Sequence, residues 1–274
     1  MKQSDVLICV FSFNMGSTLD NCLSSTEALC GGIDVVIMDD NSVEPRTVKV
    51  IEKWKDRFKV FVNTDPKEGR KHGNLYRNIQ KMFDYARERG YRYLFMVQDD
   101  MQFVRPLTGE ILAQYGRLFD ADPKRLQVDP RFLKRGQRVE IVKDGYVKND
   151  RASYVDVGIV HLDRLTESGW QMVEGERQNK RALAAMGYIR VLARTPVLMH
   201  VPFPPRYRNG SLKRSMLLRR GSYSYYPMTA SQIEHMDSRD PSSLPTYRRF
   251  LSVRNMTPIG LLAYWFRKDL RIFA

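Results

Sequence analysis

Apolar residues come in short, unbroken runs over the first hundred positions, and amphipathic stretches separate these runs. Such runs predict strands that are covered on both faces of a sheet. They lie at 5–13, within 31–42, at 59–63 and within 91–100. The stretches between them carry apolar residues at helical spacing and predict helices at 17–29, 48–58 and 73–90. Repeated β-α-β units of this size predict an α/β fold with a mostly parallel central sheet flanked by helices.

The pattern is less regular in the second half. We expect a helix at 108–119, polar connections, a hairpin at 139–148, a strand at 154–162, and helix, strand and short strand within 175–201. After residue 202 the pattern weakens in a segment rich in Pro, Arg and Gly, whose continuation is expected to pack on the domain or to lie along another surface. The chain is therefore predicted to form one domain, 1–202, with a C-terminal extension, 203–274.

Composition excludes several classes of protein. With 274 residues, 43% of them apolar, the chain can bury a hydrophobic core without stabilising disulfides or metal ions. Its three cysteines are an odd number with no close metal-ligand spacing, so we expect reduced thiols and a cytoplasmic location. No apolar run approaches the about 20 residues that span a bilayer. Ser12 and Asn14 interrupt the first apolar stretch, so no signal peptide is expected.

The formal charge is +14, and much of it lies at the end of the chain. From Arg206 onward there are 13 Lys and Arg against four Asp and Glu. Such a surplus attracts polyanions, which include nucleic acid, anionic lipid and phosphorylated ligands. Composition alone does not choose among the three.

Polar clusters follow three of the predicted strands at the point where each ends. They are Phe13-Asn14, Asp39-Asp40-Asn41 and Gln98-Asp99-Asp100. Strand-end acids are often turn residues, so one cluster alone would carry little weight. Three in one sheet favour a shared site, because ligands bind outside the carboxyl ends of parallel strands. Adjacent carboxylates suit Mn²⁺ or Mg²⁺, which one or two carboxylates hold together with substrate phosphates.

The order and spacing of these motifs resemble those of family 2 glycosyltransferases, which have the GT-A fold. The resemblance covers residues 4–202, and its motifs are "VLICVFSFNMGSTLDNCLSS", "VVIMDDNS", "GRKHGNLYRN" and "FMVQDDMQFVRP". It implies a single GT-A domain, Rossmann-like, with a nucleotide-binding half, 1–106, and an acceptor half, 107–202. It also implies inverting transfer from a nucleotide-diphosphate sugar, with UDP favoured, to a glycan or lipid-linked acceptor in cell-envelope or polysaccharide biosynthesis.

The resemblance implies roles for individual residues on the donor side. The nucleotide-binding residues would be Phe13 and Asn14 near the base, Asp39 or Asp40 on the base or ribose, and Arg77 and Asn78 at the start of a long helix. The metal motif departs from the family's Asp-X-Asp, since Gln98 stands where a Glu-Asp-Asp variant has its first acid. In that variant the last acid binds the metal, so Asp100 would be the ligand, and Asp99 would contact either the ribose or the groups that bind the metal.

Further residues come from the later motifs of the resemblance. His200 matches a histidine that completes the metal site in many GT-A domains, although a packed core histidine is the alternative. Counting back from "AMGY", 185–188, places the catalytic base on Glu176, with Glu174 as the alternative residue. Exposed acids in the first turn of a helix are the rival interpretation of both. His161 lies in the region where relatives line the acceptor pocket.

The basic extension has two interpretations. Residues 211–226 and 259–273 mix cationic and bulky apolar side chains, as segments on the inner face of an anionic membrane do. A terminal helix packed on the domain is the alternative, and residues 206–214 could instead form a lid over the donor diphosphate.

Three rival functions remain. A sugar nucleotidyltransferase would open with a Gly-rich loop and a basic residue after the first strand, whereas "SFNMGSTLDN" has one Gly and no Lys or Arg. A basic nucleic-acid-binding protein would leave the strand-end clusters unexplained. A catalytically inactive GT-A scaffold is kept open by Gln98 and Gly175, which replace expected acids.

Overall fold

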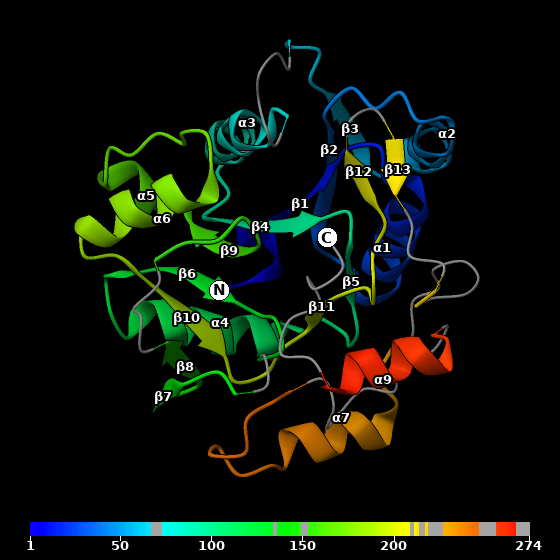
Figure 1. Ribbon diagram of the computed structural model, residues 1–274. Helices are drawn as coiled ribbons and strands as arrows, with labels where there is room; N and C mark the ends of the chain where they lie inside the picture. Colours follow the sequence, from blue (N-terminus) through cyan, green and yellow to red (C-terminus); the bar gives the residue numbers. More distant parts are fainter. Residues whose placement is uncertain are drawn as a thin grey trace.

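The computed structural model describes residues 1–66, 73–133, 136–148, 153–208, 211–213, 217–218, 227–246 and 256–266. Within these ranges nine strands form one sheet in the order β3-β2-β1-β4-β9-β6-β10-β8-β7 (Figure 1). Their bounds are β1 Val6–Ser12, β2 Asp34–Asp39, β3 Lys59–Val62, β4 Tyr93–Gln98, β6 Arg125–Asp129, β7 Val139–Val142, β8 Gly145–Lys148, β9 Gly158–His161 and β10 Ile189–Ala193.

The sheet is mostly parallel. Strand β1 pairs in parallel with both β2 and β4, and β2 and β3 are parallel, as are β6 and β10. Strand β9 is antiparallel to β4 and to β6, so these two point the same way. The expected α/β fold with a mostly parallel central sheet is confirmed.

Helices cover both faces of this sheet. Their bounds are α1 Gly16–Leu29, α2 Pro45–Trp54, α3 Leu75–Glu88, α4 Gly109–Asp120, α5 Leu162–Glu167, α6 Glu176–Ala185, α7 Ala230–Asp237 and α9 Pro258–Phe266, after a short 3₁₀ helix at Gln3–Asp5. Ile8 and Val10 of β1 pack with α1, α2 and α4, whereas Cys9 and Phe11 pack with α3, α5 and α6. Successive strand residues face opposite sides, so one apolar run serves two cores.

Two smaller ladders lie outside the main sheet. Strand β5 (Met101–Phe103) pairs antiparallel with β11 (Leu198–His200), and β12 (Arg206–Arg208) pairs antiparallel with β13 (Ser211–Lys213). The first ladder continues directly from β4 and joins residues about a hundred positions apart in the chain.

The structure corrects the expectation of polar connections after residue 119. That segment contains β6, a strand in the middle of the sheet whose last four residues, 126–129, are buried. Its polar side chains have partners: the Gln127 amide donates to the Val155 and Val157 carbonyls at 2.8 and 3.1 Å. The paired polar residues mask a buried strand in the sequence pattern.

Two helix starts also differ from expectation. Helix α1 begins at Gly16, one residue before the expected start at 17, and Ser17 and Thr18 are buried within its first turn. A Cβ at Gly16 would lie 2.5 Å from the Thr47 main-chain nitrogen, so only glycine lets α1 pack this closely on α2. Helix α2 begins at Pro45 because the Glu44 carboxylate accepts from the Thr47 main-chain N–H at 2.7 Å.

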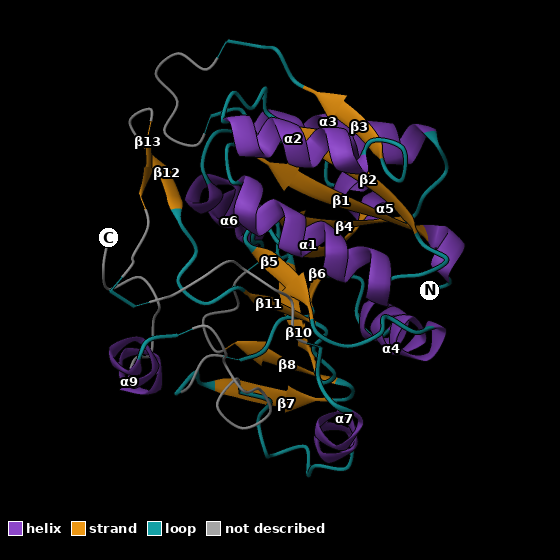
Figure 2. Cartoon of the chain, turned by 90° about the vertical axis from the view of Figure 1, so that its right-hand side faces the viewer, coloured by secondary structure: helices purple, strands orange, loops and turns teal. Residues whose placement is uncertain are grey.

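The C-terminal extension packs on the domain through α7. Met236 of this helix is fully buried in a cluster with Val104, which follows β5, and Met199 of β11. The Arg105 guanidinium, 8% exposed, holds the Asp237 carboxylate through two hydrogen bonds of 2.7 and 3.0 Å. Both α7 and α9 lie at the lower end of the molecule in Figure 1, and the view turned by 90° in Figure 2 shows that the two helices stand apart.

We predict that Asp237→Ala lowers the free energy of unfolding by about 3 kcal/mol, because it leaves the buried Arg105 guanidinium without its carboxylate. Asp84→Ala is the matched control, since Asp84 pairs with Arg87 at 3.4 Å on an exposed helix face. Loss of the Asp84–Arg87 pair is expected to lower the free energy of unfolding by under about 1 kcal/mol. Urea unfolding of the two variants measures both values, and equal costs would contradict this anchoring role of Arg105.

Candidate functional site

The three strand-end clusters meet at one edge of the sheet. The Phe13 main-chain N–H donates to the Asp99 carboxylate at 2.9 Å, so the ends of β1 and β4 are joined. The Asp40 N–H donates to the Ser12 carbonyl at 3.0 Å and joins β2 to β1. The order of the sheet reverses here, since β1 stands between β2 and β4. The predicted convergence of these clusters is confirmed, and it falls where ligands bind in such sheets.

Several of the predicted nucleotide ligands also organise the loops at this edge. Asp39, 2% exposed, accepts hydrogen bonds from the Ser42 N–H at 2.7 Å and from its hydroxyl at 2.6 Å. Asp40 accepts from the Asn74 N–H at 3.0 Å, just before α3. The Asn14 side-chain oxygen accepts from two main-chain N–H groups, at residues 43 and 44. These contacts fix the loops, and nucleotide binding by the three residues remains a prediction.

Phe13, Arg77 and Asn78 lie at different depths. Asn78 is buried in the first turn of α3 and accepts a hydrogen bond from the Asn63 side chain, whereas Arg77 is exposed. The ring of Phe13 is half-buried and meets the ring of Tyr207 edge to face, with centroids 5.4 Å apart. Strand β12 of the extension therefore reaches the predicted base site.

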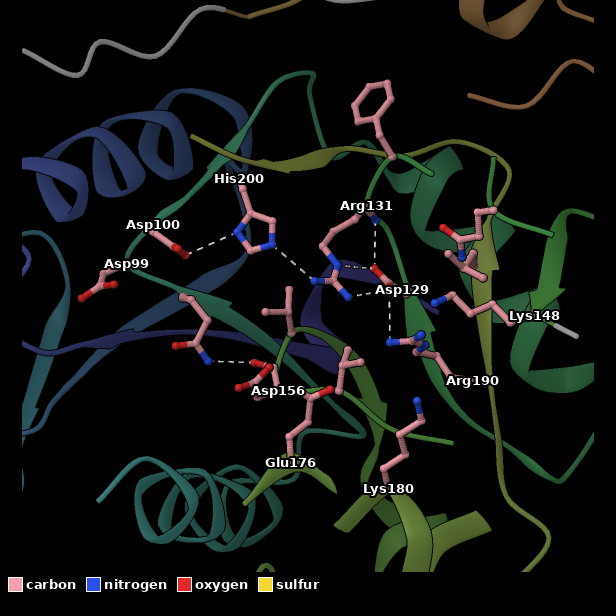
Figure 3. A pocket seen from close by; sticks show the side chains of 16 residues that line it. Asp99, Asp100, Asp129, Arg131, Lys148, Asp156, Glu176, Lys180, Arg190 and His200 are labelled. Carbon is pink, nitrogen blue, oxygen red and sulfur yellow. Dashed lines mark hydrogen bonds and ion pairs between the residues drawn. The ribbon is translucent and has the colours of Figure 1, made fainter. Parts of the chain in front are cut away.

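The two predicted metal ligands face each other across the rim of a cavity of about 420 Å³ (Figure 3). Asp100 follows β4, and His200 ends β11, where it lies opposite Met101 of β5. This ladder brings the His200 Nδ1 atom to 3.5 Å from an Asp100 carboxylate oxygen. Burial raises the pKa of Asp100, but the charge and hydrogen bond of His200, together with a main-chain hydrogen bond and the charge of Arg131, outweigh burial. The net pKa lies below the ordinary value.

The pKa of Asp99 is shifted in the opposite direction, upward. Burial, followed by the charge of Asp100, raises the pKa of Asp99 well above its ordinary value. A cation beside the two carboxylates would relieve their repulsion. Gln98, which stands where the variant motif has its first acid, donates its side-chain amide to the Asp156 carbonyl at 2.8 Å.

The residues present fit a divalent ion that also takes ligands from a substrate. Among the described residues, no group of three or more His, Cys, Asp or Glu side chains is arranged to hold a metal. Asp100 and His200 would supply two ligands, and oxygens of a diphosphate and water would complete the shell of Mn²⁺ or Mg²⁺. The metal-binding role of both residues remains a prediction.

The structure distinguishes the two candidate bases. Glu176, the first residue of α6, is half-buried and lines the cavity, whereas Glu174 is exposed and does not. Asp156, which precedes β9, lies beside Glu176 in the same cavity (Figure 3). Burial, and next the charge of Glu176, raise the pKa of Asp156 to about 6. Two carboxyl groups therefore share this wall, and only one of them was predicted.

Other charged residues of the cavity were missed as well. They are Asp129, Arg131, Lys148, Lys180 and Arg190. Asp129 ends β6, whose sequence RLQVD contains no apolar run, so the signal used for the other acids is absent there. Asp156 interrupts the apolar run 154–162. The cations carry no such signal, because they come from separate elements.

His161 lies outside the cavity, which corrects its expected place in the acceptor pocket. Its ring packs against Tyr93 and Phe119, with centroids 4.9 and 5.5 Å away. Because β9 is antiparallel to β4, His161 pairs with the first residue of β4 and so lies at the opposite edge of the sheet. Burial, and next Arg164, lower the pKa of His161 to about 4.

Part of the chain matches the sequence model of one protein family. Residues 7–129 match the model of glycosyl transferase family 2. No curated protein matches the chain.

Two solved structures resemble it in fold. The mannosyltransferase PcManGT from Pyrobaculum calidifontis, in complex with GDP-Man and Mn²⁺, has 16% sequence identity and a TM-score of 0.48. The alignment covers 70% of this chain and 55% of that one, so this chain spans little more than half of that transferase. A mycobacterial protein has 14% identity and a TM-score of 0.42, with 74% of this chain and 68% of that one covered.

We predict that Glu176→Gln lowers the pKa of Asp156 from about 6 toward its ordinary value, because it removes a negative charge from the same wall. A raised carboxyl pKa lowers stability as the pH rises from about 4 to about 6, so the variant should lose less stability across that window. The titration is followed by NMR of the Asp156 carboxyl carbon. Glu174→Gln, which removes an exposed charge, is the control, and an equal shift in both variants would contradict the assignment.

Proposed function

We propose that the protein transfers a sugar from a nucleotide-diphosphate sugar to a hydroxyl acceptor, because residues 7–129 match the model of glycosyl transferase family 2. The observation that carries the proposal is the cavity in which Asp100 and His200 face Glu176 and Asp156. The proposed donor is a UDP-sugar, and the proposed setting is cell-envelope or polysaccharide biosynthesis.

The donor would lie along the edge where β1, β2 and β4 end. The loops held by Asn14, Asp39 and Asp40 would shape the base and ribose site, with the ring of Phe13 against the base. The diphosphate would then reach the Asp100–His200 pair. A divalent ion bound there would act as a Lewis acid that offsets charge on the departing diphosphate.

The acceptor hydroxyl would lose its proton to a carboxylate on the opposite wall. Glu176 is the residue we propose, because it lines the cavity and lies at the start of α6. The attacking oxygen would approach the anomeric carbon from the side opposite the leaving diphosphate, which inverts the configuration. Asp156, beside Glu176, would hold the acceptor or orient the base.

We further propose that the extension rests on an anionic membrane surface on the cytoplasmic side. Leu217, Ile259 and Leu262 are 63%, 54% and 55% exposed, and we call them the C-terminal apolar patch. They are close in space, because the Thr257 hydroxyl before α9 donates to the Leu217 carbonyl at 2.6 Å. Exposed apolar side chains within a basic segment suit a membrane interface. In the described part of the chain no helix has the length and hydropathy to span a bilayer.

We predict that UDP binds in the presence of Mn²⁺ and that Asp100→Ala abolishes the dependence on the metal. The reason is that Asp100 would hold the ion against the diphosphate. Calorimetric titration with UDP, GDP, CDP and dTDP, with and without Mn²⁺, measures this and identifies the base.

Glu176→Gln is the matched control for that titration. It should retain nucleotide binding while transfer falls at least about a hundredfold, as expected for the loss of a general base. If no nucleotide binds with or without metal, the transferase proposal fails. If RNA binds in a salt-sensitive way instead, a basic nucleic-acid-binding protein is the better description.

We predict that the protein sediments with vesicles that contain anionic lipid and not with purely zwitterionic vesicles. The double variant Ile259→Ser and Leu262→Ser should bind less, because each side chain loses about 1.5–3 kcal/mol of apolar burial. Val43→Ser with Val48→Ser, which changes exposed side chains at the other end of the chain, is the control. Equal binding of both double variants would show that the C-terminal apolar patch does not contact the membrane.

A further inference from the structure

Three cationic side chains converge on one wall of the cavity. Lys148 ends β8, Arg190 lies in β10 and Lys180 lies in α6, and all three line the cavity. Figure 3 shows their nitrogens directed toward the same space, on the side away from Asp100 and His200. Like charges from three separate elements repel one another in such an arrangement. A fold that brings them together therefore favours an anion between them.

Asp129, an acid beside this group, already forms ion pairs with arginine side chains. Asp129 is 2% exposed and accepts two hydrogen bonds of 2.8 Å from the Arg131 guanidinium. Burial raises the pKa of Asp129, but Arg131 and Arg190 outweigh it and bring the pKa to about 2. Arg190 also lies 3.5 Å from this carboxylate. One carboxylate offsets one positive charge, so the wall formed by Asp129, Arg131, Lys148, Lys180 and Arg190 keeps a surplus of positive charge.

Among the three cations, Lys180 gives the strongest support for a bound anion. Its side chain is half-buried, and in the described part of the structure its ammonium makes no hydrogen bond or ion pair. The helix that carries it is fixed, because the Lys180 carbonyl accepts a hydrogen bond from the Ser153 hydroxyl. Lys180 follows Glu176 by four residues, so both lie on the same face of α6, one turn apart.

We propose that Lys148, Lys180 and Arg190 form a subsite for an anionic group of the acceptor, either a phosphate or a carboxylate. The inference rests on the proposed function, because it places the acceptor beside Glu176. An oxyanion held by these residues would set the acceptor hydroxyl next to the candidate base. It would also keep the acceptor's charge away from the donor diphosphate, which would lie at Asp100 and His200.

The test titrates the full-length protein with three sugars: α-D-glucose 1-phosphate, D-glucuronate and D-glucose. NMR of the lysine side-chain methylene groups reports binding at Lys180 and Lys148. We expect one or both anionic sugars to shift these signals and neutral glucose to leave them unchanged. The tighter of the two identifies the oxyanion as phosphate or carboxylate.

Variants supply the control. Lys180→Gln should weaken binding of the anionic sugar about tenfold, as expected for the loss of one charge-assisted contact. Lys148→Gln should act in the same direction from a different element. Arg181→Gln removes the same charge from an exposed position on α6 that does not line the cavity, and it should have no effect.

Three results would overturn the inference. One is that neither anionic sugar shifts the lysine signals, and another is that Lys180→Gln and Arg181→Gln weaken binding equally. The third is that Lys180→Gln weakens binding of UDP with Mn²⁺ but not of the anionic sugar, which would assign these cations to the donor. Failure of the wild-type protein to bind any nucleotide with Mn²⁺ is a separate result, which removes the proposed function and the acceptor assignment with it.

Discussion

Parallel pairing of β1 with both β2 and β4 is the constraint on which the site depends. It places three carboxyl ends side by side, where the main-chain ladder stops and N–H groups need new acceptors. The carboxylates supply them: Asp99 accepts from the loop after β1, and Asp40 accepts from the residue before α3. Strand-end acids therefore act as loop organisers here, and this role is compatible with a ligand site. Asp100 differs, because its partner is His200 at the cavity rim.

The antiparallel strand β9 determines what lies opposite. Because it runs against β4, its beginning lies at the carboxyl edge of β4, and Asp156 comes next to Gln98. The amide of Gln98 holds the main chain at Asp156, so the residue that replaces an expected acid joins the two walls of the cavity. In a sheet with every strand parallel, His161 rather than Asp156 would stand at this edge. The direction of one strand thus decides which titratable group enters the site.

The fold could be predicted from the sequence wherever the signal was local. Unbroken apolar runs identified β1 and β2, and the strand-end acids identified the edge of the sheet that carries the site. Strand β6 was missed, because Asp129 makes its sequence look solvated while Arg131 and Arg190 pair with it. The basic wall was missed for a related reason. Long-range pairing of β10 with β8 brings Arg190 near Lys148, and α6 adds Lys180, and no local pattern records either arrangement.

Charge is distributed unevenly in the cavity, and this has a consequence for how it responds to pH. Asp129 keeps its charge down to a pH of about 2, because two guanidinium groups hold it. Asp156, at about 6, changes charge within the range where cells and enzymes work. Protonation of Asp156 therefore changes the charge beside Glu176 while Asp129 stays ionised. An anion bound by Lys180 and Arg190 would keep its partners while the charge beside the candidate base varies, so acceptor binding and proton transfer can depend on pH separately.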